Sequence, residues 1–183
     1  VPVVAQQEAR AKAPAADPLA EARKLHASGR DDDAIRILQD LIAARGDDPR
    51  SPKGSLESLL LLARALANLG RLGAALDWCE RAVESAKMEP AAHLLRATVL
   101  QERGELQDAA ESFRRAIYLD PDCVLAHFSL ANLARQRKDK TGTRKHLDNA
   151  RRLLSGFEED DEIPQSDGMT AGRLIRIIEA SVE

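Results

Sequence analysis

Apolar residues recur along most of the chain at intervals of three and four, which is the spacing of one face of an α-helix. The clearest stripe runs through Leu59, Leu62 and Leu66 and stops at Gly70. A second stripe, which includes Cys79, begins directly after that glycine. Glycine accepts the positive φ that a tight turn between two helices requires. The pattern therefore predicts two helices joined as a hairpin, and similar stripes on either side predict further hairpins.

The hairpins repeat with a period of 34 residues. Gly70 and Gly104 are 34 residues apart, and the pair Ala92-His93 returns 34 residues later as Ala126-His127. Small residues keep two further phases of the same period: Ala75, Ala109 and Thr143 in one, and Ala82, Ala116 and Ala150 in the other. Small side chains at fixed phases indicate places where the two helices of a hairpin cross closely.

This period and these phases resemble the tetratricopeptide repeat, a helix–turn–helix unit that stacks into a solenoid. The resemblance covers residues 17–154 and implies an all-α solenoid of about four repeats. We place the repeats at about 17–45, 55–88, 89–122 and 123–154. Leu59, His93 and His127 stand where the family usually has an aromatic residue in the first helix.

The segments outside the repeats differ in composition. Residues 1–16 mix alanine, proline and glutamine, and we expect a linker that tethers an N-terminal element. A turn-rich insertion, 46–54, separates the first two repeats. We expect residues 155–168 to form an acidic, proline-containing loop and residues 169–183 to form a capping helix, with Thr170 as its N-terminal cap. Whether this helix covers the end of the core or occupies the groove stays open at this point.

Composition excludes several classes of function. Aromatic residues make up only 3% of the chain and the net charge is -3, which is the opposite of the basic, aromatic-lined surface of a nucleic-acid binder. No apolar run approaches the roughly 18 residues that span a bilayer. We therefore expect neither nucleic-acid binding nor membrane insertion, and a cytoplasmic location. Cys79 falls on an apolar helix phase, which predicts a buried, reduced thiol.

The sequence shows no constellation of catalytic residues. The four histidines are scattered, and His93 and His127 lie at equivalent positions of neighbouring repeats. Two imidazoles without carboxylate or thiolate company make a poor metal site, so we expect these two to pack between repeats. No Ser/His/Asp or Cys/His arrangement is present. We expect no catalytic residue, no metal and no cofactor in this segment.

The remaining functional surface is the concave groove that the first helices of the repeats line. Three arginines and several amides around apolar anchors suit a protein or peptide of acidic character, because arginine donates forked hydrogen bonds to carboxylates. Ordinary solvated helix residues are the alternative interpretation of each position. The side chains that the repeat phase directs toward the groove are Arg23, His26, Leu60, Arg64, Asn68, Leu94, Thr98, Gln101, Phe128, Asn132 and Arg135.

A second resemblance concerns the order of segments. The repeats, the acidic stretch and the final run 163–178 (IPQSDGMTAGRLIRII) resemble the C-terminal region of CheR-type chemotaxis receptor methyltransferases that carry added repeats. The resemblance implies an upstream domain that uses S-adenosylmethionine to methylate chemoreceptor glutamates. Partners would then be a chemoreceptor or the chain's own catalytic domain. The alternative hypothesis is a generic adaptor from an unrelated bacterial system.

Overall fold

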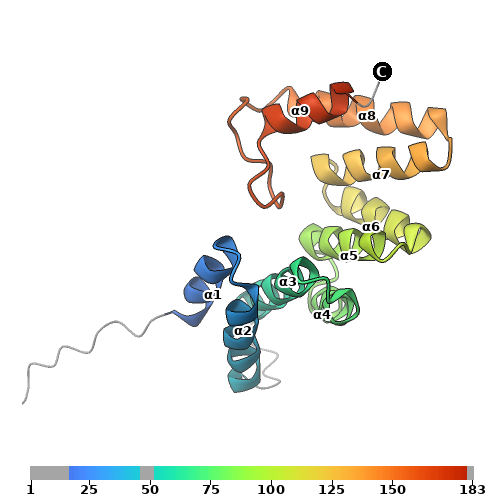
Figure 1. The fold of residues 1–183 in the computed structure, drawn as a ribbon. Coiled ribbons are helices and arrows are strands. Elements are labelled where there is room, and N and C mark those ends of the chain that lie inside the picture. Colours follow the sequence, from blue (N-terminus) through green and yellow to red (C-terminus); the bar gives the residue numbers. More distant parts are fainter. Residues whose placement is uncertain (1–16, 46–51, 181–183) are drawn as a thin grey trace, which may run out of the picture.

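The computed structural model describes residues 17–45 and 52–180, and within them the chain is entirely helical apart from turns and one isolated β-bridge. Figure 1 shows the helices stacked one after another into a curved array. The elements are α1 (Pro18–Ala27), α2 (Asp31–Arg45), α3 (Pro52–Asn68), α4 (Leu72–Ser85), α5 (Pro90–Glu102), α6 (Leu106–Leu119), α7 (Val124–Gln136), α8 (Lys140–Leu154) and α9 (Ala171–Ala180). The first eight form four hairpins, in which each helix also packs on the one that follows. The predicted all-α solenoid is confirmed.

The turns inside the four hairpins share one geometry. Gly29, Gly70 and Gly104 have φ of 76°, 70° and 83°, and Lys138 takes the same position in the last hairpin with φ of 59°. In each turn the residue that follows donates its N–H to the carbonyl five positions back, as from Arg71 to Leu66 at 2.9 Å. This bond satisfies a carbonyl that the helix end leaves unpaired. The left-handed turn residue therefore ends the first helix of each hairpin and reverses the chain direction before the second helix.

Small residues occupy the helix crossings, as the period predicts. Ala75, Ala109, Ala82, Ala116 and Ala150 are all fully buried. Their short side chains let the helices approach closely, and larger apolar residues fill the spaces between crossings. Thr143 stands at the corresponding crossing of the last hairpin and is only half-buried.

The repeat boundaries differ locally from those expected. Helix α3 begins at Pro52, inside the segment 46–54 that was expected to be an insertion. Proline suits the first turn of a helix, because the N–H it lacks would have no partner there. The predicted linker 1–16, positions 46–51 and the last three residues lie outside the described residues.

The last helix caps the stack. Leu174 and Ile178 of α9 are buried with Leu154 of α8 and with Ile163 of the preceding loop. The start of α9 sits against the backbone of Glu159, whose carbonyl oxygen would lie 3.1 Å from a Cβ at position 172. Gly172 permits this approach, and its N–H donates to that same carbonyl at 2.9 Å. In this way the acidic loop and the capping helix form one terminal layer.

Candidate functional site

A cleft lies on the inner side of the curved array, between the first helices of three hairpins and the loop that precedes α9. The first helices α3, α5 and α7 supply one wall, and a turn from the loop before α9 supplies the other. The cleft has a volume of about 230 Å³. We call it the inner groove, and its lining residues are Arg64, Ala91, Leu94, Leu95, Thr98, Leu125, Ser129, Gln165, Ser166, Asp167 and Met169.

An ion pair joins the two walls of the inner groove. The guanidinium Nη1 of Arg64 donates to Oδ1 of Asp167, a residue 103 positions further along the chain. The Arg64 side chain is 24% exposed, whereas that of Asp167 is 54% exposed. The arginine is therefore part of the groove wall, and the carboxylate reaches it from a projecting turn.

Local hydrogen bonds give that turn its shape. Ile163 donates its backbone N–H to the Met169 carbonyl at 2.9 Å, which closes the turn at its base. The Ser166 hydroxyl both accepts from the Met169 N–H at 2.9 Å and donates to the Met169 carbonyl at 3.1 Å. Gln165, Asp167 and Gly168 all have positive φ. We call residues 163–169 the groove turn, because this tight conformation directs Asp167 at α3.

The structure also decides what the sequence left open about the C-terminal region. The capping helix α9 covers the end of the core, and the groove turn that precedes it enters the inner groove. In Figure 1 the loop before α9 extends away from α8 toward the inner side of the array. Sequence reasoning missed Asp167 and Met169 as groove residues, because no local pattern specifies a contact with α3.

Three residues predicted for the groove lie near the N-terminal hairpin and contact neighbouring helices. Arg23 on α1 forms an ion pair with Glu57 on α3. His26 Nδ1 lies 2.5 Å from Oδ1 of Asp31, and Asn68 donates to the other oxygen of that carboxylate at 3.3 Å. The buried Asp31 therefore ties α1, α2 and α3 together.

The apolar members of the predicted set belong largely to the core. Leu94 is 5% exposed, so only its edge reaches the inner groove. Leu60 is half-buried and packs with the core of the first two hairpins. Phe128 is half-buried against the layer formed by α8 and α9. Thr98 is exposed and donates its hydroxyl to the Leu94 carbonyl at 3.1 Å.

The polar members beyond Thr98 lie toward the ends of α5 and α7. The side-chain oxygen of Gln101 is buried and has no hydrogen-bond partner within the described part of the chain. Arg135 donates to Oδ1 of Asn132 at 3.0 Å and lines a different cleft. The predicted set is thus divided: Arg64, Leu94 and Thr98 meet in the inner groove, whereas Arg135 faces another surface.

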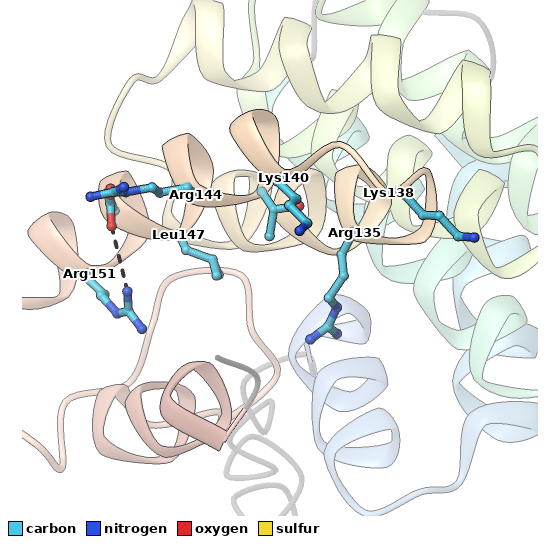
Figure 2. Close-up of a pocket in the computed structure, with 8 residues that line it drawn as sticks. Arg135, Lys138, Lys140, Arg144, Leu147 and Arg151 are labelled. Carbon is cyan, nitrogen blue, oxygen red and sulfur yellow. Dashed lines mark ion pairs between the residues drawn. The ribbon is translucent and has the colours of Figure 1, made fainter. Parts of the chain in front are cut away.

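That other surface is a basic cleft along α8, with a volume of about 690 Å³. Figure 2 shows the side chains of Leu147, Arg151 and Arg135 directed to the same open side of α7 and α8. We call it the basic cleft, and its lining residues are Arg135, Lys138, Lys140, Thr143, Arg144, Leu147, Asp148 and Arg151. Sequence reasoning missed most of it, although the helical spacing of Lys140, Arg144 and Arg151 was a usable signal.

The two histidines that were expected to pack between repeats differ in their contacts. His127 is buried and its Nδ1 lies 3.2 Å from Nδ1 of His146, within one hairpin. His93 is half-buried and contacts the Lys87 carbonyl at 2.9 Å instead. His93 thus contacts the end of the preceding repeat, in line with the expected packing between repeats, whereas His127 contacts an imidazole of its own hairpin. Burial lowers the pKa of His127, and burial together with the neighbouring His127 lowers the pKa of His146.

The two thiols are buried and free. Cys79 is fully buried in the core between α3 and α4, and burial raises its pKa to about 12. Burial also raises the pKa of the Cys123 thiol. Both groups are therefore held as neutral thiols, and the predicted buried thiol at Cys79 is confirmed.

The described part of the chain holds neither a metal cluster nor a membrane-spanning helix. Within 17–45 and 52–180, no three His, Cys, Asp or Glu side chains come close enough together to hold a metal ion. Over the same residues, no helix combines the length and the apolar character needed to cross a membrane.

The repeat geometry agrees with comparison to known families. The tetratricopeptide repeat family profile matches residues 19–90 and 94–156, which together exceed half of the 183 residues. The chain belongs to the tetratricopeptide repeat family. No curated protein matches it significantly in sequence.

Several solved structures share the fold. MamA superposes with a TM-score of 0.67 at 20% identity, over 76% of this chain and 77% of that chain. TTC0263, a thermophilic TPR protein in Thermus thermophilus, gives 0.60 at 21% identity, over 74% of this chain and 72% of that one. A tetratricopeptide repeat protein from Parabacteroides merdae gives 0.64 at 18% identity, over 88% of this chain and 57% of that one. At these identities the likeness concerns the fold alone.

Proposed function

We propose that this chain is a non-catalytic adaptor that binds a segment of another protein in the inner groove, with a carboxylate of that segment on Arg64. The observation that carries the proposal is the seating of the groove turn, in which Asp167 forms an ion pair with Arg64. A groove that accommodates one polypeptide segment of the chain itself offers the same contacts to a segment from a partner. The family supports the general role, because repeat solenoids present extended concave surfaces for binding.

The residues that line the inner groove indicate the chemistry of the segment that would bind there. Leu94, Leu95 and Leu125 offer apolar contact, and Thr98 and Ser129 offer hydroxyl groups. An acidic residue one or two positions from an apolar one would match this arrangement, as Asp167 and Met169 do in the groove turn. The proposed ligand is therefore a short segment with one carboxylate and one flexible apolar side chain.

A narrower hypothesis makes the chain the C-terminal module of a chemoreceptor methyltransferase. Its support is the resemblance of the run 163–178, which forms the groove turn and most of α9. The comparisons support the broader adaptor better, because MamA and the other similar structures described above carry no link to chemotaxis methylation in their names. The gene sequence upstream of Val1 tests the narrower form: an α/β domain with a glycine-rich cofactor loop there would support it.

Selection of peptides tests the adaptor proposal directly. Short random peptides are displayed on phage and selected against the chain carrying Asp167→Ala, which removes the carboxylate that occupies Arg64. We expect the selected peptides to share an Asp or Glu at a fixed distance from an apolar residue. Arg64→Glu, introduced into the same variant, should then weaken their binding about tenfold or more, because it replaces an attraction by a repulsion in a partly buried site.

A matched variant distinguishes the effect of a charge in the inner groove from the effect of the net charge of the chain on peptide binding. Arg114→Glu makes the same change of charge at an exposed position on α6, outside the lining of the inner groove. Selected peptides should bind that variant nearly as well as the parent. Peptides whose affinity is indifferent to Arg64, or reduced equally by both substitutions, would contradict the proposed function.

A further inference from the structure

The basic cleft has a strong excess of positive charge. Five of its eight lining side chains are cationic and one, Asp148, is anionic. Asp148 lies 3.7 Å from both Arg144 and Arg151, so a single carboxylate is shared between two guanidinium groups. Arg144 is 86% exposed, which makes its contact with Asp148 a weak, solvated one. The exposed side chains of Lys140 and Arg144 therefore keep their positive charge accessible to a ligand.

The basic cleft lies at the C-terminal end of the solenoid, on the last helix of the last hairpin. Along the solenoid, the second helix of each hairpin packs against the first helix of the next, as α4 does with α5 and α6 with α7. After α8 this place is taken by α9, whose buried residues pack beside Leu147, Ala150 and Leu154. Lys140 and Arg144 lie nearer the start of α8, and both are exposed.

One face of α8 carries the binding groups. Lys140, Arg144, Leu147 and Arg151 follow one another at intervals of four, three and four, so they form a single stripe along the helix. Leu147 is 7% exposed and forms the apolar floor in the middle of this stripe. Figure 2 shows Leu147 between the two arginines of α8 and the two lysines near its start.

We propose that the basic cleft is a second interaction surface, which binds an acidic amphipathic helix of a partner protein. Such a helix would lie along the stripe of α8 that carries these cations, beside α9, which itself takes the place of a further repeat's first helix. Its carboxylates would accept hydrogen bonds from Lys140, Arg144 and Arg151, and an apolar residue on the same face would contact Leu147. The volume of about 690 Å³ matches a few side chains of one helical face.

The chemistry of the lining favours a polypeptide over a nucleic acid. No aromatic residue is among the side chains that line the cleft, so bases would find no stacking partner there. The chain as a whole has a net charge of -3, which repels a long polyanion. A short acidic helix meets the local positive charge and keeps its remaining surface in water.

A designed pair of peptides tests this proposal. The first is a fluorescent helical peptide with glutamates along one face and leucines at its centre, and the second has glutamine at every glutamate. Fluorescence anisotropy with the full chain should show saturable, one-to-one binding of the glutamate peptide only. Raising the ionic strength should weaken that binding, because exposed charges are screened.

Two charge-reversal variants locate the surface. Lys140→Glu with Arg144→Glu should weaken binding of the glutamate peptide about tenfold, because both changes introduce repulsion in the stripe. The matched control is Arg173→Glu with Arg176→Glu, since both residues are exposed on α9 and neither lines the cleft. The control should retain the affinity of the parent chain to within about twofold. Thermal unfolding monitored by circular dichroism checks that both variants keep the helical fold.

Several results would overturn the proposal. Absence of saturable binding would do so, as would equal affinity for the glutamine peptide or equal losses in both charge-reversal variants. Tighter binding of a short DNA duplex than of the glutamate peptide would assign the surface to nucleic acid instead. The inner groove shares no residue with this cleft, so its failure as a binding site would leave this result unaffected.

Discussion

Lys138 is the turn residue whose type departs most clearly from the repeat pattern, although its backbone keeps the geometry of the other turns. Three hairpins turn through glycine, and this one turns through an exposed lysine with φ of 59°. A side chain with a Cβ is disfavoured in this left-handed region by about 1 kcal/mol or more. The hydrogen bond from Asp139 to the Ala134 carbonyl, at 2.9 Å, holds the turn in place despite that cost.

Replacing Lys138 by glycine should therefore stabilise the chain. We expect Lys138→Gly to raise the free energy of unfolding by about 0.5–1 kcal/mol, since relief of the strain exceeds the added freedom of the unfolded chain. Urea unfolding followed by circular dichroism measures the change. Lys138→Ala serves as the control and should leave the stability nearly unaltered. A glycine variant less stable than the alanine variant would show that the turn carries no such strain.

The histidine pair predicts a pH dependence. Because burial lowers the pKa of His127 and His146 below 6.5 in the folded chain, the unfolded chain binds more protons as the pH falls. Their contribution to stability is present above about pH 6.5 and is lost as the pH drops through the lowered folded values. The free energy of unfolding should accordingly decrease between about pH 7 and pH 5.

A pair of variants isolates this effect from the titration of carboxylates. His146→Gln removes one member of the pair and should flatten the decrease in stability, whereas His93→Gln should leave it as in the parent chain. His93 is the suitable control because it is half-buried and its ring contacts the Lys87 carbonyl rather than an imidazole. Parallel pH profiles for all three chains would contradict the role given to the pair.

At the scale of elements, α9 functions as the end cap of the core. Leu174 is fully buried in the cluster that includes Leu154 and Ile163, so it joins the last helix to α8 and to the loop. Leu174→Ala should lower the free energy of unfolding by about 2–5 kcal/mol, because it removes buried methyl groups and leaves a cavity. Denaturant unfolding is the measurement.

A neighbouring residue on the same helix provides the comparison. Ile177 is 38% exposed, and Ile177→Ala should change the stability by less than about 1 kcal/mol. Similar losses for the two variants would mean that α9 is stabilised by its own helical propensity rather than by the core it covers.

The elements could be predicted from the sequence wherever their cause is local. Gly70 and Gly104 mark turns because positive φ is a property of the residue itself, and Ala82 or Ala116 marks a crossing because only a small side chain fits there. The start of α3 at Pro52 was missed, since the same proline also suits a turn. Lys138 was placed correctly in the turn by the period, although its type gave no indication of positive φ.

The arrangement of the candidate site depends on contacts that no period encodes. Arg64 was predicted to face the groove, but its partner Asp167 lies 103 residues away in a loop without repeat character. Arg135 shares the phase of a groove residue and nevertheless lines the basic cleft, because it lies at the last turn of α7 beside α8. Repeat phase therefore predicts the helix face, and the path of the loop determines what that face contacts.

For the whole molecule, the proposed function makes the groove turn a competitor of the partner, because Asp167 of the turn is paired with Arg64. The tether of the turn to α8 and α9 would keep it at a high effective concentration near Arg64, so that a partner would have to displace it. Asp167→Ala should increase the affinity of a selected peptide severalfold, because an exposed ion pair contributes about 0.2–1 kcal/mol. Isothermal titration calorimetry gives the comparison.

Asp160→Ala is the matched control for this prediction. Asp160 is an exposed carboxylate of the same loop and lies outside the lining of the inner groove. Its removal changes the net charge equally and should leave the affinity unchanged. An equal gain in both variants would indicate a general electrostatic effect of the acidic loop rather than competition for Arg64.

The most direct test of the account is a map of where a selected peptide binds. The isotopically labelled chain is titrated with the peptide, and backbone amide shifts are followed by nuclear magnetic resonance. We predict that the largest changes occur on the inner faces of α3, α5 and α7 and in the groove turn, as the turn leaves Arg64. Changes confined to α4 and α6, with the signals of α3 and the groove turn unmoved, would contradict the claim that the inner groove holds the partner.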